Sequence, residues 1–202
     1  KTGEQILRTH KTKVGLFRYK EGQGDILQDF AELTYSGGRT KVSELIGKNC
    51  PEFVFPNYED QDYVKVQLDE KSLAFAEKHM GDFGESFLRS MLWQTGWDMV
   101  RDSRMSVGRF ADLVLKSMDQ GEDDEQIVQF WAGKYSQFTD NGFARFFPQT
   151  TKEQQSSYDK FVAKSHEVAW RQVNAAEEGS DLQRIWFETF MSTAASRKEL
   201  VR

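Results

Sequence analysis

One segment of the sequence approaches the spacing of a zinc-binding helix. His166 and Glu167 match the first two positions of the His-Glu-x-x-His motif, in which two histidines bind zinc and the glutamate is the general base. Trp170 stands where the second histidine would be, and an indole cannot ligate zinc. The other histidines, His10 and His79, lie in an N-terminal segment and at the end of a separate predicted helix. The sequence therefore predicts no metal ligands and no catalytic residues in this chain, and it assigns no substrate-binding residue.

Two acidic clusters could also hold a cation. Residues 122–125 (Glu-Asp-Asp-Glu) lack the ligand spacing of an EF-hand and fit the start of a helix, where the helix dipole favours negative charge. Residues 59–62 (Glu-Asp-Gln-Asp) fit a polar turn between β and α structure. Cys50 is the only cysteine and precedes Pro51 and an apolar run, so we predict a small buried side chain and no internal disulfide.

The first third of the chain has the pattern of β structure. Apolar and polar residues alternate over 13–20, a glycine-containing turn follows at 21–24, and a second alternating segment completes a hairpin. A second turn at 36–38 precedes two further candidate strands. Together these segments predict a small antiparallel sheet or sandwich of about four strands, at 13–20, 26–35, 39–45 and 52–55.

The rest of the chain has the signals of helix ends. Thr151 and Ser180 each have a glutamine three residues later, which is capping-box spacing. Because most connecting loops are short, consecutive helices should pack antiparallel as a stack of helical hairpins resembling an α-solenoid. The fold class is therefore α+β in two segments, a small β domain at 1–66 and a helical domain at 67–202. Six helices are predicted, at 70–80, 83–102, 107–119, 124–139, 152–177 and 181–195, capped by Asp69, Asp82, Ser106, Asp123, Thr151 and Ser180.

The helix predicted at 83–102 has apolar residues around most of its circumference, so we expect it to be buried, with Trp97 in the core. Its run from Leu92 and Trp93 through residues 97–102 resembles the helix that opens the C-terminal domain of actinobacterial aminopeptidase N, a zinc-dependent gluzincin. The resemblance is collinear from about Val14 to about Phe190, through segments such as 39–47, 68–73 and 177–186.

This resemblance implies that the chain is a non-catalytic part of an enzyme that removes N-terminal amino acids from peptides. The zinc and the catalytic domain of the same polypeptide would lie outside this chain, so the chain itself would hold no cofactor and be inactive. It would help to enclose the active-site cavity and limit the size of peptide substrates. The alternative is an independent helical module that binds a partner protein.

Composition argues against nucleic acid and a membrane as partners. The chain has 27 basic and 32 acidic residues and a pI near 5.4, which disfavours binding to nucleic acid. No apolar run approaches the ~20 residues that span a bilayer. A single cysteine agrees with a reducing compartment, so the expected location is the cytoplasm.

The end of the sequence contains another helix-start pattern. Ser196 and Glu199 have capping-box spacing, which predicts a new helix just before the last residue printed. We therefore expect an excised segment whose final helices lack part of their cover. Self-association of the chain would follow, through apolar residues of these helices, namely Ile185, Trp186, Phe187 and Phe190.

Overall fold

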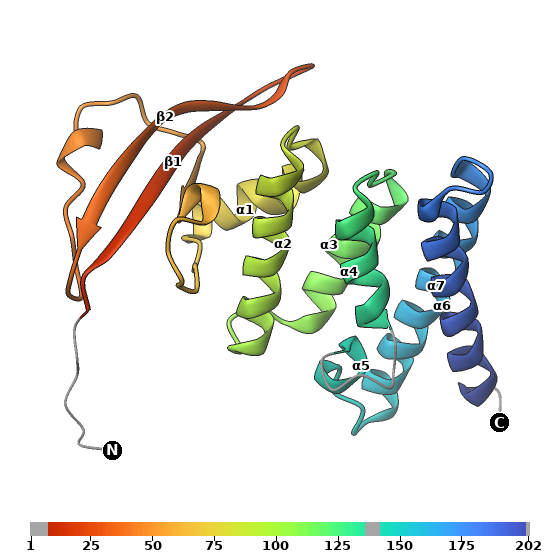
Figure 1. Cartoon of the computed structure of the whole chain (residues 1–202). Coiled ribbons are helices and arrows are strands. Elements are labelled where there is room, and N and C mark those ends of the chain that lie inside the picture. Colours follow the sequence, from red (N-terminus) through yellow and green to blue (C-terminus); the bar gives the residue numbers. More distant parts are fainter. Residues whose placement is uncertain (1–7, 136–141, 201–202) are drawn as a thin grey trace. The chain divides into compact units, whose positions relative to one another are not determined.

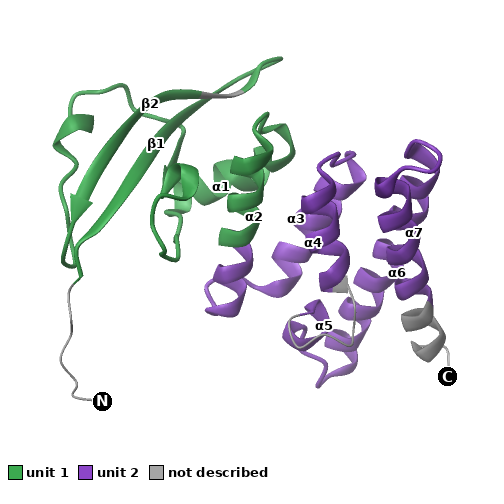
Figure 2. Cartoon of the chain, viewed as in Figure 1, with its two compact units in different colours: residues 1–95 green, residues 96–202 purple. Residues whose placement is uncertain are grey.

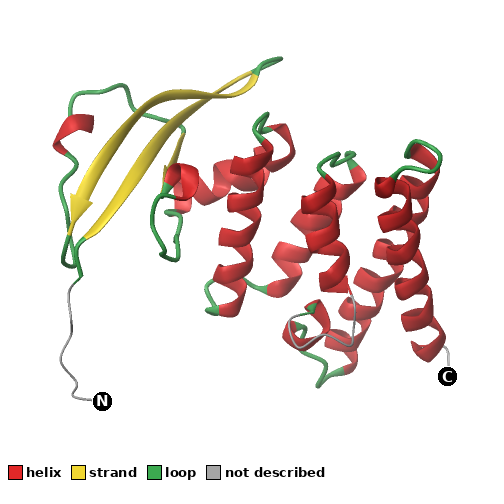
Figure 3. Cartoon of the chain, viewed as in Figure 1, coloured by secondary structure: helices red, strands yellow, loops and turns green. Residues whose placement is uncertain are grey.

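The computed structural model describes residues 8–135 and 142–200 and places strands before helices, as the sequence predicts (Figures 1 and 3). Its three antiparallel strands are β1 (His10–Lys20), β2 (Gly24–Tyr35) and β3 (Phe53–Pro56), in the order β2-β1-β3. The predicted hairpin of β1 and β2 is confirmed. Its turn is closed by the Gln23 amide, which donates to the Lys20 carbonyl at 2.9 Å.

The expected strand at 39–45 is wrong. Residues 39–42 join no ladder, and Ser43–Leu45 is a short 3-10 turn. β1 already has β2 on one side and β3 on the other, so its hydrogen-bonding edges are occupied.

The prediction that Cys50 is buried is also wrong, because its side chain is exposed. It belongs to the surface loop in front of β3, and burial begins only at Phe53.

The chain forms two compact units, residues 1–95 and 96–202 (Figure 2). The core of the first unit is aromatic. A register shift between Leu16 and Phe17 turns both side chains into the interior, and the Phe17 ring packs at 5.5 Å from Phe53 and 5.3 Å from Tyr58. Helix α1 (Glu70–His79) adds Phe75, whose ring stacks at 5.6 Å on Phe53.

Four of the six predicted caps are confirmed, and each satisfies an amide that a helix start leaves unpaired. Those residues are Asp69, Ser106, Thr151 and Ser180. The helices after α1 are α2 (Ser86–Arg101), α3 (Val107–Asp119), α4 (Glu125–Tyr135), α5 (Phe143–Phe146), α6 (Lys152–Ala175) and α7 (Asp181–Leu200).

Several helix predictions differ from the structure. Asp82 lies in a 3-10 turn and α2 starts only at Ser86, while Asp124 rather than Asp123 caps α4. The predicted tail of α4 at 136–139 falls outside the described residues. No new helix starts at Ser196, because α7 continues to Leu200 through a segment without glycine or proline.

In the second unit, α6 packs along α7, and these two helices lie against α3 and α4 (Figure 2). The predicted stack of helical hairpins is confirmed in this arrangement. The expectation that Ile185 and Trp186 lack cover is wrong, because they are 4 % and 2 % exposed. Trp97 is 2 % exposed and its ring meets Phe143 and Phe146 at 5.4 and 5.1 Å. Within residues 8–135 and 142–200, no helix combines the length and apolar character needed to cross a bilayer.

Candidate binding cleft

The residues of the incomplete zinc motif stabilise the last hairpin. The Nδ1 atom of His166 lies 3.1 Å from Oγ1 of Thr193 on α7. Its ring stacks on Phe190 at 4.3 Å, and Trp170 packs on the same phenylalanine at 4.9 Å. The histidine and the tryptophan therefore hold α6 and α7 together through one ring, a structural use of both side chains.

His10 takes part in a separate polar cluster in the first unit. Its Nδ1 lies 3.0 Å from both carboxylate oxygens of Asp62, and the Tyr35 hydroxyl donates to Asp62 at 2.9 Å. The hydrogen bond from His10 lowers the pKa of Asp62 below its usual value, and that from Tyr35 acts in the same direction. Burial and the neighbouring carboxylate raise the pKa of Tyr35.

The two acidic clusters, residues 59–62 and 122–125, belong to a turn and to a helix start. Asp124 accepts the amides of Gln126 and Ile127 at 3.0 and 3.1 Å, so the cluster at 122–125 caps α4. Asn57 adopts the left-handed conformation and fastens the turn at 59–62. In the described part of the chain, His, Cys, Asp and Glu side chains form no group of three or more that could hold a metal.

The Asn57 side chain is buried and saturated with hydrogen bonds. Its carbonyl oxygen accepts the Asp62 amide at 2.7 Å and the Thr12 hydroxyl at 3.2 Å. Its amide nitrogen donates to the Asp62 carbonyl at 2.8 Å and to Asp60 at 3.2 Å. The turn therefore has a structural explanation, and its left-handed residues Asn57, Glu59 and Asp60 are held by these bonds.

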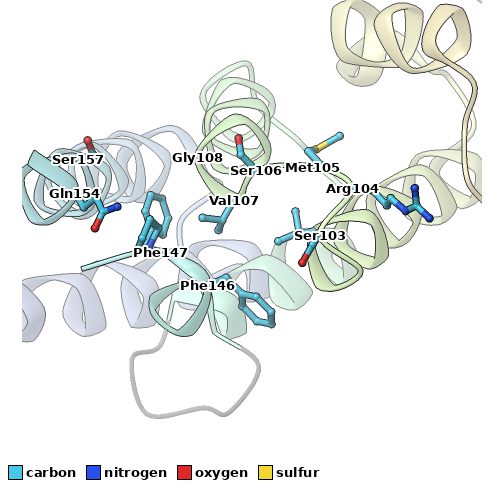
Figure 4. Close-up of a pocket in the computed structure, with 12 residues that line it drawn as sticks. Ser103, Arg104, Met105, Ser106, Val107, Gly108, Phe146, Phe147, Gln154 and Ser157 are labelled. Carbon is cyan, nitrogen blue, oxygen red and sulfur yellow. The ribbon is translucent and has the colours of Figure 1, made fainter. Parts of the chain in front are cut away.

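A cleft of about 610 Å³ lies in the second unit (Figure 4). One wall comes from the α2–α3 connection and the first turn of α3, residues 103–108. The opposite wall comes from the end of α5, Phe146–Pro148, and from Gln154 and Ser157 on the first two turns of α6. The cleft is therefore assembled from two parts of the chain about forty residues apart.

The first wall is set by the way α2 ends. Ser103 has φ 58°, its amide donates to the Val100 carbonyl at 3.0 Å, and the Arg104 amide donates to the Met99 carbonyl at 2.7 Å. These two bonds form a Schellman motif, in which glycine is the usual left-handed residue. The Ser106 hydroxyl then caps α3 by accepting the Arg109 amide at 3.3 Å.

The second wall rests on the aromatic core. Phe146 faces the cleft and also packs edge-on against Trp97, while Phe147 stacks on Phe161 at 5.1 Å. Helix α6 begins beside them with a complete capping box between Thr151 and Gln154. Because these contacts fix α5 and the start of α6, the shape of the cleft depends on the core beneath it.

The lining residues are suited to binding rather than to chemistry. Apolar side chains of Met105, Val107 and Phe147 lie beside hydroxyl groups, and Arg104 is the only charged residue among the twelve, directed away from Phe147 (Figure 4). Three of the twelve are serines, but none is a histidine, cysteine, aspartate, glutamate or lysine, so no lining residue could act as the general base that a serine nucleophile requires.

The sequence did not assign this cleft, because helix α5 was not predicted. A signal was present: Phe143, Phe146 and Phe147 follow helical spacing and stop in front of Pro148, where a helix ends. A four-residue helix is too short for periodicity to identify.

Comparison with known proteins places the chain in a family. Residues 53–201 match the family model of the ERAP1-like C-terminal domain. The chain is also 33 % identical, over 199 residues, to aminopeptidase N from Streptomyces lividans. That alignment covers 98 % of this chain and 22 % of the aminopeptidase, so the chain spans about a fifth of this relative's length. The resemblance seen in the sequence is thus confirmed, and the chain belongs to the ERAP1-like C-terminal domain family.

Proposed function

We propose that this chain is the non-catalytic, largely helical part of a zinc aminopeptidase that removes N-terminal amino acids from peptides. The observation that carries the proposal is the alignment of nearly the whole chain with part of an aminopeptidase N. The zinc and the general base would lie in the catalytic domain of the same polypeptide, which is the partner of this chain. A cytoplasmic location and a boundary near residues 66 and 67 belong to the same proposal.

Within that enzyme, this chain would help to enclose the active-site cavity and limit the size of the substrate. The cleft between residues 103–108 and 146–157 is the candidate for contact with the peptide. Its volume lies in the range of small-molecule and side-chain pockets, and its mixture of apolar side chains and hydroxyl groups suits a peptide segment. The residues would act by steric fit and not by proton transfer.

The test of the parent activity uses the full polypeptide that contains this chain. We expect it to hydrolyse aminoacyl-arylamides, to lose this activity with a chelator and to regain it with zinc. The 202-residue chain alone should neither hydrolyse these substrates nor bind stoichiometric zinc. A full polypeptide without aminopeptidase activity, or an active isolated chain, would contradict the proposal and favour an independent interaction module.

The test of the cleft uses two glycines on helices of the second unit. A side chain added at Gly108, which lines the cleft, or at Gly133 on α4 meets no atom within 4 Å. In the full enzyme, Gly108→Trp should partly fill the cleft and lower kcat/KM for peptides several-fold, with little effect on short arylamides. Gly133→Trp should leave both unchanged. Equal losses with both substrates at Gly108 would show that the cleft does not select by peptide length.

A further inference from the structure

A second cavity, of about 440 Å³, lies entirely within the first unit. Its floor is one face of the sheet. Thr12 and Leu33 are paired across β1 and β2, and the register of β3 places Pro56 on the same face. Its walls are two segments, 37–40 and 64–67, which join no strand ladder. We call this site the sheet cavity.

The walls of the sheet cavity have main-chain groups without partners. Among the described residues, the backbone amides and carbonyls of 38–40 and 66–67 make no hydrogen bond. The floor adds an acceptor, because the Thr12 hydroxyl donates its proton to Asn57 at 3.2 Å and keeps its lone pairs. Both floor residues are nine-tenths or more buried, at 7 % and 4 % exposure.

A ligand of this site must therefore supply both N–H donors and acceptor atoms. A phosphate or a simple carboxylic acid has no N–H group to meet the unpaired carbonyls and the hydroxyl of Thr12. An extended peptide has donors and acceptors in alternation along its whole length, which is the basis of recognition by strand addition. The volume also lies in the range of ligand pockets.

The charge of the lining selects among peptides. Arg39 and Lys65, one on each wall, are the two charged residues of the lining, and both are positive. No carboxylate of the described residues pairs with Arg39. Asp62 does not line the cavity, and its carboxylate is held by His10 at 3.0 Å and by the Tyr35 hydroxyl at 2.9 Å. The lining is thus complementary to an acidic ligand.

We propose that the sheet cavity binds a short extended peptide, supplied by another molecule, in which apolar and acidic residues alternate. The peptide main chain runs between the two walls. Because the side chains of a strand alternate between its two sides, the apolar ones contact Leu33 and Pro56, and the acidic ones pair with Arg39 and Lys65. This site is separate from the cleft of the second unit, and peptide binding there does not depend on aminopeptidase activity.

Fluorescence anisotropy with the full polypeptide that contains this chain tests the proposal. The probe is acetyl-Val-Glu-Val-Glu-Val-amide carrying a dye, and the acetyl group protects it from hydrolysis at the N-terminus. It should bind saturably and more weakly as the salt concentration rises, and the same peptide with glutamines should bind several-fold more weakly. Absence of saturable binding would show that the cavity is covered or occupied by other parts of the polypeptide, and would overturn the proposal. Equal affinities of the two peptides would overturn it as well.

Two pairs of variants place the binding in the sheet cavity. A side chain added at Gly38, which lines the cavity, or at Gly84, which does not, meets no atom within 4 Å. Gly38→Trp should fill the cavity and weaken binding at least several-fold, whereas Gly84→Trp should bind as the wild type does. Arg39→Glu should weaken binding similarly, and Arg18→Glu, at an exposed arginine of β1 outside the lining, should not. Circular dichroism should show that all four variants are folded. Wild-type affinity in both cavity variants, or equal losses in the controls, would overturn the proposal.

Methylation of the probe's amides tests the main-chain contacts. An N-methyl group removes one donor and leaves every side chain of the peptide in place. At least one of the singly methylated probes should bind several-fold more weakly than the parent peptide, because its N–H would otherwise meet a carbonyl of 38–40 or 66–67. Unchanged affinity of every methylated probe would overturn the proposed extended binding mode.

Discussion

Replacing Trp97 by alanine should remove the centre of the second unit's core. The indole is 2 % exposed and packs within 5.1–6.5 Å of four aromatic rings, those of Phe110, Trp131, Phe143 and Phe146. Lys134 also lies with its ammonium group 5.2 Å from the indole, in a site where burial and then Arg101 lower the pKa of the lysine. These contacts come from three different helices, α3, α4 and α5, so the loss should affect the whole unit.

The magnitude follows from the buried area. A tryptophan side chain has roughly 200–250 Å² of surface, and nearly all of it is buried here. At about 25 cal/mol per Å², and after subtracting the part that alanine retains, the transfer term is roughly 4 kcal/mol. Lost ring contacts add to this value and relaxation of the cavity subtracts from it, so Trp97→Ala should cost about 3–5 kcal/mol of unfolding free energy.

Urea unfolding followed by far-UV circular dichroism measures this cost without depending on tryptophan fluorescence. The matched control is Trp170→Ala in the same unit, which removes a half-exposed indole and should cost no more than about 2 kcal/mol. Both chains are measured at the same protein concentration. If Trp97→Ala costs the same as or less than Trp170→Ala, the assignment of Trp97 to the core is refuted.

Three further outcomes can be measured by the same method. Gly96→Ala should cost about 1–3 kcal/mol despite the better helix propensity of alanine, because its Cβ would lie 2.5 Å from a ring carbon of buried Phe110; an unchanged urea midpoint would contradict this. Ser103→Gly should stabilise by about 0.5–1 kcal/mol, since φ 58° is strained for serine; destabilisation would argue against the Schellman geometry. Asp62 has a lowered folded-state pKa, so it stabilises the fold above the ordinary aspartate pKa of about 3.9. Its advantage over Asp62→Asn should shrink as pH falls from about 5 through that folded value, and a difference independent of pH would contradict the assignment.

Helix starts and the first hairpin were predictable because their signals act within a few residues. The Thr151 hydroxyl accepts the Gln154 amide three positions on, and Asp69 accepts the amides of Lys71 and Ser72. The turn between β1 and β2 likewise depends on neighbouring glycines with positive φ. Such interactions exist in any context in which the local backbone forms.

Predictions that required knowledge of a neighbouring element failed. Residues 39–45 have a strand-like pattern, but no edge of β1 remains for them. Ser196 has the spacing of a cap, yet α7 already occupies that segment and has no residue that would end it. Cys50 precedes an apolar run and is still exposed, because the surface loop ends only at β3.

The sequence by itself determined the order of strands and helices, most of the caps, the buried helix around Trp97 and, by resemblance, the aminopeptidase family. Only the tertiary structure decided which side chains meet. The three histidines lie in different environments, and the cleft is lined by segments about forty residues apart. Phe187 is exposed, although its neighbour Trp186 is buried. Caps and turns depend on contacts a few residues away, whereas clefts and exposed faces depend on where distant segments pack.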